Sequence, residues 1–188
     1  MSNRSCLLPF AMFLTLFVVS ACSSPSRTAD QSTNEARMLA IDTQTAIDRF
    51  KAQDPSMIRF FDTAHGYVVF PSVGKGGAVV GGAHGDGQVF ESGKLVGTAT
   101  LSQFTLGLQL GGQEYREVIF LNNKGAFDNF TSGEFEFSGQ ASAVAAEAGA
   151  AEGADYSPNG VAVFLMPIAG LMAEASIGGQ KFEYAPVR

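Results

Sequence analysis

The spacing of hydrophobic residues changes along the chain near Gly66. Before that point, apolar residues recur at steps of three and four, which is the period of a helix with one buried face. After it, short runs of valine, leucine and aromatic residues alternate with glycine, which is typical of strands and tight turns. The pattern therefore predicts N-terminal helices followed by a β-sheet.

Two helices are expected before the sheet. The first is predicted over residues 35–53, and the second begins after Asp54, which caps it with Pro55 in the first helical position. Gly66 is expected to end the second helix in the left-handed conformation. The side chains expected to face the core are Ala36, Leu39, Ala40, Thr43, Ile47 and Phe50 in the first helix, and Met57, Ile58, Phe61 and Ala64 in the second.

The remainder of the chain is predicted to be mainly β. A short helix is expected over residues 124–130, capped by Asn123 with Phe127 and Phe130 facing inward, and residues 156–160 form a turn. Strands are expected at residues 67–70, 78–83, 87–91, 95–110, 117–121, 134–138, 161–165, 171–177 and 181–184. The predicted fold class is α+β, with N-terminal helices packed on a glycine-rich, mainly antiparallel sheet or partly closed barrel.

Residues 66–87, GYVVFPSVGKGGAVVGGAHGDG, are the most regular stretch. Two apolar runs predict strands, with a glycine-rich turn over residues 71–77 between them and a second turn at residues 85–87. Lys75 lies at the centre of the first predicted turn, between Gly74 and Gly76.

The first 22 residues have the pattern of a bacterial lipoprotein leader. Arg4 precedes an apolar run too short for a comfortable membrane span, and small residues lead to Cys22. We expect residues 1–21 to be a signal peptide, Cys22 to be acylated, residues 22–32 to be a flexible tether and residues 33–188 to form a single domain. The alternatives to a lipoprotein leader are an ordinary signal peptide that is cut nearby and an anchor that is not cleaved. An Asp directly after the lipidated cysteine would favour retention in the inner membrane, so Ser23 at that position favours the outer membrane.

Composition and charge narrow the function classes. The net charge is −6, and loss of Arg4 with the leader makes the mature domain more acidic, so nucleic acid is not an expected partner. Cys6 leaves with the leader and Cys22 is lipidated, so no disulfide or thiolate metal site is expected. His65 and His84 lack metal-ligand spacing, and no nucleophile motif is present. We therefore expect no metal, no cofactor and no enzymatic activity.

The turn around Lys75 is one candidate for anion binding. Gly follows the lysine, and a β run follows the turn, so the segment does not match a nucleotide-binding loop. Backbone N–H groups at Gly74 and Gly76, together with the Lys75 ammonium, can still hold a phosphate or lipid headgroup. A solvated lysine in a hairpin turn is the simpler interpretation and is favoured.

The first helix is a second candidate, for contact with a membrane surface. Arg37, Arg49 and Lys51 can approach lipid phosphates from an amphipathic helix. Asp42 and Asp48 dilute its basic face, which favours the alternative of an ordinary helix packed on the sheet.

The block GYVVFPSVGKGG, followed by VGGAHG, resembles the SYLF domain, a lipid-binding domain of endocytic adaptor proteins that also occurs in bacterial lipoproteins. The similarity continues through residues 108–113, 118–121 and 127–130 and covers roughly residues 35–184. The resemblance implies a mixed α/β domain that binds phospholipid through basic residues and an N-terminal amphipathic helix. Lys75 lies within the matched block, whereas Arg37, Arg49 and Lys51 lie in the corresponding helical region without a residue-by-residue match.

The acidic charge and the lack of a dense basic cluster depart from the family pattern. The phosphoinositide binding of eukaryotic SYLF domains and the actin binding of some fungal members are therefore not carried over to this chain. The sequence predicts a lipid-anchored bacterial envelope protein, at the periplasmic face of the outer membrane, whose domain binds membrane phospholipid. The alternative is a non-enzymatic structural or protein-interaction lipoprotein, whose protein partner the sequence does not identify.

Overall fold

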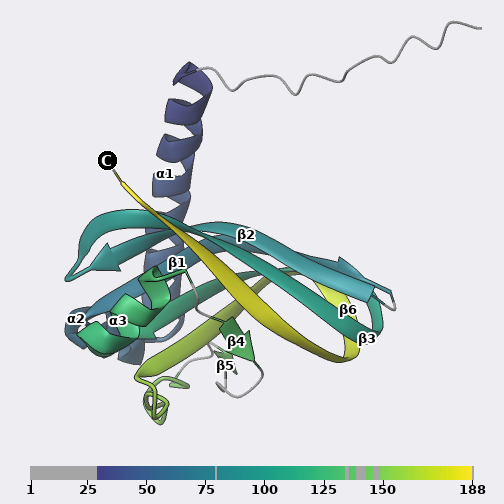
Figure 1. Ribbon diagram of the computed structural model, residues 1–188. Helices are drawn as coiled ribbons and strands as arrows, with labels where there is room; N and C mark the ends of the chain where they lie inside the picture. The colour runs from purple at the N-terminus through teal and green to yellow at the C-terminus, as the bar shows by residue number, and fades with distance from the viewer. Residues whose placement is uncertain (1–28, 79, 134–135, 139–142, 146–148, 188) are drawn as a thin grey trace, which may run out of the picture.

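The computed structural model describes residues 29–78, 80–133, 136–138, 143–145 and 149–187 (Figure 1). The predicted signal peptide and Cys22 lie outside the described residues. The described helices are α1 (Ala29–Gln53), the 3-10 turn η1 (Pro55–Met57), α2 (Ile58–Thr63) and α3 (Lys124–Thr131). The described strands are β1 (Gly66–Gly77), β2 (Val80–Glu91), β3 (Lys94–Leu121), β4 (Glu136–Ser138), β5 (Ala143–Ala145) and β6 (Val161–Pro186).

The strands form a six-stranded sheet in the order β1-β2-β3-β6-β4, with β5 beside β6. All pairings are antiparallel except the short β5–β6 contact. The sheet stays open, although β3 is long enough to pair with β2 through its first half and with β1 through its second half. The α+β prediction is confirmed, and of the two predicted architectures the open sheet is the one observed.

The glycine-rich turns predicted in the first part of the sheet are wrong. β1 continues through residues 71–77, and β2 continues through residues 85–87. The glycines serve close packing instead, because a Cβ atom at Gly87 would lie 2.5 Å from the Val69 carbonyl oxygen. The β2–β3 turn comes later, at Ser92 and Gly93, where φ is 48° and 76°.

β3 and β6 each join segments that were predicted as separate strands. β3 runs through both residues 95–110 and 117–121, and β6 runs through all three of the last predicted strands. Glycines that we interpreted as turns between strands lie within continuous strands, where they permit a bend without ending the hydrogen-bonded ladder. The sheet therefore has fewer and longer strands than predicted.

The helices follow the predicted pattern with shifted ends. α1 begins at Ala29, so the end of the predicted tether is helical. Asp54 caps η1 by accepting a hydrogen bond from the Ser56 N–H, as predicted, but the second helix ends at Thr63 and Gly66 begins β1. Asn123 caps α3 as predicted, and Phe127 and Phe130 are buried.

The core has two parts, one on each face of the sheet. One part lies between the sheet and α3 and is dominated by Phe70, Phe130 and Phe182. The other lies beneath α1 and α2 and includes Phe50, Phe60 and Phe120. Figure 1 shows α2 and α3 at one end of the sheet and the bends of β3 and β6 at the other.

α1 has two dissimilar halves. Thr43, Ala46, Ile47 and Phe50 are buried against the sheet, whereas the first half of the helix rises above it (Figure 1). Ala36 and Ala40, predicted to be buried, are exposed because the sheet does not extend beneath them. In the next helical segment Phe60 is buried, whereas Ile58, predicted to face the core, is 43% exposed.

Candidate functional site

A groove lies between the C-terminal half of α1 and the paired strands β3 and β6. It has a volume of about 550 Å³. α1 contributes Arg49, Ala52 and Gln53, β3 contributes Arg116, and β6 contributes Met166, Pro167 and Ile168. The groove therefore combines two guanidinium groups with an apolar wall.

The local fold explains why these side chains meet. Ala46 and Phe50 are fully buried and fix α1 on the sheet, which leaves Arg49 at the border of the contact. Opposite α1, the pairing of β3 with β6 shifts register between Glu114 and Tyr115, so that Ile168 is an extra residue on β6. Such an irregularity bends a strand and suits Pro167, which has no N–H to donate.

A second, smaller hollow adjoins the first. Its volume is about 240 Å³, and it shares Arg116 and Ile168 with the groove. Asp42 and Glu114 make this hollow acidic, and Glu114 accepts a hydrogen bond of 2.6 Å from the Ser72 hydroxyl. Among the residues that the structure describes, no acidic side chain lines the first hollow, so an anion is favoured there and a cation in its neighbour.

Lys75, Gly74 and Gly76 do not form the predicted anion-binding turn. All three lie in β1, where Lys75 is half-buried and sits opposite Ala83 on β2 and Gln113 on β3. Because the backbone here runs in a strand between two neighbours, its N–H groups do not converge on one point, as a phosphate-binding turn requires. The turn geometry is wrong; lipid contact by the Lys75 side chain stays a prediction.

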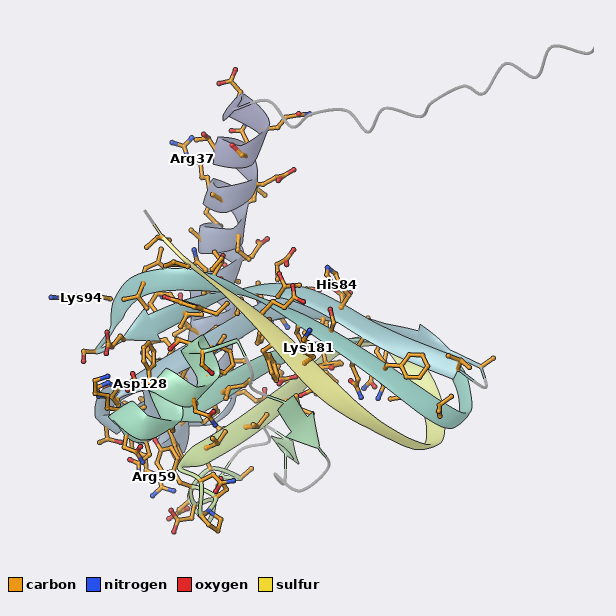
Figure 2. The ribbon with its side chains drawn as sticks, in the orientation of Figure 1. Arg37, Arg59, His84, Lys94, Asp128 and Lys181 are labelled. Atoms are coloured by element: carbon orange, nitrogen blue, oxygen red, sulfur yellow. The ribbon has the colours of Figure 1, made fainter. Side chains whose placement is uncertain are left out.

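The three cations predicted on the first helix are separated by the structure. Arg37 lies on the exposed first half of α1 (Figure 2). Lys51 places its Nζ atom 4.8 Å from the centroid of the Phe61 ring, a cation–π contact that holds it over α2. Arg49 enters the groove, so of this predicted set it alone lines the site.

Arg116 is the basic residue of the groove that sequence reasoning missed, along with its apolar wall. It precedes the predicted strand at residues 117–121 and belongs to no motif. It is far from Arg49 in sequence, and only the packing of α1 on the sheet brings the two residues to one groove. No spacing along the chain signals that arrangement.

Arg59 is a cation with a structural role. Its Nη2 atom donates hydrogen bonds of 2.6 Å to the carbonyl oxygens of Ala151 and Ala154. Its guanidinium carbon also lies 4.7 Å from the centroid of the Phe60 ring. Figure 2 shows Arg59 far from Arg37, at the opposite end of the molecule. Its bonds to these carbonyls make it part of the scaffold.

The two histidines occupy separate places. His65 Nε2 lies 3.1 Å from Glu91 Oε1, and its ring packs edge-on against Phe127. His84, predicted in a turn, lies within β2 opposite Gly74. Within the part of the chain that the structure describes, no three His, Cys, Asp or Glu side chains gather as metal ligands. None of the described helices is both long and apolar enough to cross a bilayer.

The fold and groove define an α+β domain with a cationic, partly apolar hollow where a helix meets the sheet. Residues 102–184 match the Ysc84 family model, described as "Las17-binding protein actin regulator". Beta cell expansion factor A from Aeromonas veronii is 32% identical over 157 residues, 81% of this chain and 58% of that protein. Both matches are consistent with the SYLF family of lipid-binding domains that the sequence resembles. It spans 58% of the length of this curated relative.

Proposed function

We propose that this protein is a lipid-anchored component of a bacterial envelope. It binds membrane phospholipid in the groove between α1 and the sheet. The observation that carries the proposal is that Arg49 and Arg116 line the same groove as Met166, Pro167 and Ile168. Arginine is suited to phosphate because its planar guanidinium presents several donors at once. The adjoining apolar wall suits the glycerol and upper acyl carbons of the same lipid.

The exposed first half of α1 also supports contact with a membrane. Met38 and Ile41 are 56% and 53% exposed and lie three residues apart, so they share one side of the helix. Arg37 adds a cation beside them. A helix with exposed apolar and basic residues is suited to the membrane interface. The predicted anchor at Cys22 lies just before this helix and holds it near the bilayer.

Flotation with phospholipid vesicles tests the proposal. The chain from Ser23 to Arg188 carries no acyl group, and every contact described above lies within residues 29–187, so this chain keeps all of them. We expect it to float with phosphatidylethanolamine–phosphatidylglycerol vesicles at low salt. Failure to float with these vesicles at low salt, where screening is weakest, overturns the proposal.

Charge reversal within the groove tests where the lipid binds. Arg116→Glu and Arg49→Glu are each expected to weaken vesicle binding about tenfold or more, because each replaces attraction to phosphate by repulsion. Lys94→Glu is the matched control, since it makes the same charge change at an exposed site beside the β2–β3 turn (Figure 2). Equal losses in all three variants would show that net charge, rather than the groove, controls binding.

Lys75→Glu tests the remaining predicted contact in the same assay. A loss of binding beyond that of Lys94→Glu would add Lys75 to the lipid-binding surface. An affinity equal to that of the unaltered chain would remove it.

A further inference from the structure

The end of the sheet farthest from α2 and α3 is almost free of charge. It contains the β1–β2 hairpin and the bends of β3 and β6 (Figure 1). We define this distal tongue as residues 76–78, 80–82, 104–112 and 171–179. Glu174 is its single charged residue, in a chain with 30 charged side chains among 188 residues, 12 basic and 18 acidic.

Strand register brings these segments together. Gly77 pairs with Gly81 and Gly111, while Leu106 pairs with Val80 on one side and Ile177 on the other. β3 is therefore an interior strand of the tongue, with neighbours along both edges. Its backbone donors and acceptors have partners within the sheet, which is the condition for placing backbone in a medium without water.

Large apolar side chains are exposed on the tongue. Val80, Phe104 and Leu106 are 53%, 60% and 57% exposed. Val80 lies directly opposite Leu106, so these two side chains point to the same face, and Phe104 lies two residues along that face. They form a continuous apolar surface, and a contiguous patch of this kind marks an interaction site.

The groove and the tongue follow one another along the same strands. β3 passes from Arg116 in the groove to Leu110 in the tongue, and β6 passes from Ile168 to Leu171. Six residues of strand from Arg116 to Leu110 span about 20 Å. One leaflet's hydrocarbon layer is about 15 Å thick. With Arg116 among lipid phosphates, the tongue is long enough to reach the acyl chains of the near leaflet.

We infer that the distal tongue inserts its apolar face, Val80, Phe104 and Leu106, into the acyl region of the membrane that the groove contacts. This inference rests on the proposed function and extends it from headgroup contact to partial insertion. The charge pattern selects the occupant: an almost uncharged surface next to a pair of arginines complements a layer of hydrocarbon beneath a layer of phosphate. A charged protein surface offers no such match.

A single tryptophan reports insertion directly, because the chain contains no tryptophan. Phe104→Trp places an indole on the tongue, and Ile58→Trp places one on α2 as the matched control, since Ile58 is 43% exposed. Both variants start at Ser23 and are mixed with phosphatidylethanolamine–phosphatidylglycerol vesicles whose acyl chains carry bromine. We expect the emission of Phe104→Trp to move to shorter wavelength and to be quenched, and that of Ile58→Trp to do neither.

The outcomes separate this inference from the proposed function. If Arg116→Glu weakens vesicle binding but the emission of Phe104→Trp is not quenched, then insertion is overturned and binding by the groove is still supported. If the emission of Phe104→Trp shifts without vesicles, and the shift grows with protein concentration, then a second copy of the chain covers the patch. That result also overturns insertion. Lack of vesicle binding by the unaltered chain overturns both.

A charge on the tongue provides an independent test. Phe104→Glu is expected to reduce vesicle binding about tenfold or more, because it removes a large apolar side chain and brings a charge to the same place. Ile58→Glu is the matched control and is expected to leave binding unchanged. Equal binding by the two variants contradicts insertion, and thermal unfolding of each verifies that the fold is intact.

Discussion

Glu117 places a carboxyl group in the core on the α3 side of the sheet. Its side chain is fully buried, and its Oε2 accepts a hydrogen bond of 3.2 Å from the Gln180 amide, whereas its Oε1 has no hydrogen-bond partner among the described residues. Burial raises the pKa of Glu117 to about 7, against the opposing effect of the Gln180 hydrogen bond. At neutral pH this carboxyl is therefore close to its titration midpoint inside the protein.

Glu117 makes stability depend on pH. Its pKa is higher in the folded state than the 4.5 of an unperturbed glutamate, so the folded state binds the proton more tightly. Stability contributed by the protonated carboxyl is full below about pH 4.5 and is lost as the pH rises to about 7, by up to about 3 kcal/mol. Urea unfolding at pH 5 and pH 8 measures the difference.

Glu117→Gln is expected to remove this pH dependence, because glutamine keeps the shape and can bond to Gln180 without ionising. Glu183→Gln, which alters an exposed carboxyl on the same face of β6 as Lys181, is the control and should keep it. The same loss of stability between pH 5 and pH 8 in Glu117→Gln as in the unaltered chain would show that another group titrates.

Asp54 ties the helical segment to a distant loop. Its Oδ1 caps η1 through the Ser56 N–H, and its Oδ2 accepts a 2.7 Å hydrogen bond from the Ala151 N–H. Burial acts to raise the pKa of Asp54, but hydrogen bonds from Ser56 and Ala151 outweigh it, so the pKa is lowered. Its contribution to stability is therefore present at neutral pH and is lost as the pH falls through its lowered pKa.

Asp54→Ala is expected to lower the free energy of unfolding by about 2 kcal/mol, because it removes the cap and leaves the buried Ala151 N–H without its acceptor. Asp62→Ala, at an exposed position on α2, is the control and should change stability by less than about 0.5 kcal/mol. Thermal or urea unfolding compares them. Equal stability of the two variants would contradict a structural role for Asp54.

At the scale of the elements, the glycine-rich block shows why strands were harder to predict than helices. Helix caps are local: Asp54 and Asn123 bond to N–H groups two or three residues away, so sequence alone identified them. Gly85 and Gly87, by contrast, are glycines because the neighbouring strand β1 passes too close to leave room for a Cβ atom. A Cβ atom at Gly85 would lie 2.7 Å from the Ser72 carbonyl oxygen. This requirement arises from the register in which β1 pairs with β2. In the sequence alone, such a glycine looks the same as a glycine in a turn.

Two glycines of this block are predicted to respond differently to alanine. Gly87→Ala should destabilise the protein by about 2 kcal/mol, because its Cβ would collide with the backbone of Val69 and the ring of Phe70. Gly74→Ala should change stability by less than about 0.5 kcal/mol, since a Cβ there meets nothing within 4 Å. Unfolding midpoints decide between them. Equal effects would contradict a close-packing role for Gly87.

At the scale of the whole molecule, the division into N-terminal helices and a following antiparallel sheet was predictable, because hydrophobic period reports which face of each element is buried. The groove was predictable only in part. Arg49 stands out as a basic residue on an amphipathic helix, whereas Arg116 reaches the groove only because α1 packs on the folded sheet. Long-range packing of that kind leaves no pattern within either segment.

The central claim is that the groove binds phospholipid, and the salt dependence of vesicle binding tests it most directly. The measurement compares the chain from Ser23 to Arg188 with its Arg49→Glu, Arg116→Glu double variant on phosphatidylglycerol-containing vesicles over a series of salt concentrations. We predict that the unaltered chain binds tightly at low salt and progressively less tightly as salt screens its arginines, and that the double variant binds weakly throughout. Identical affinities of the two chains at every salt concentration would contradict the claim.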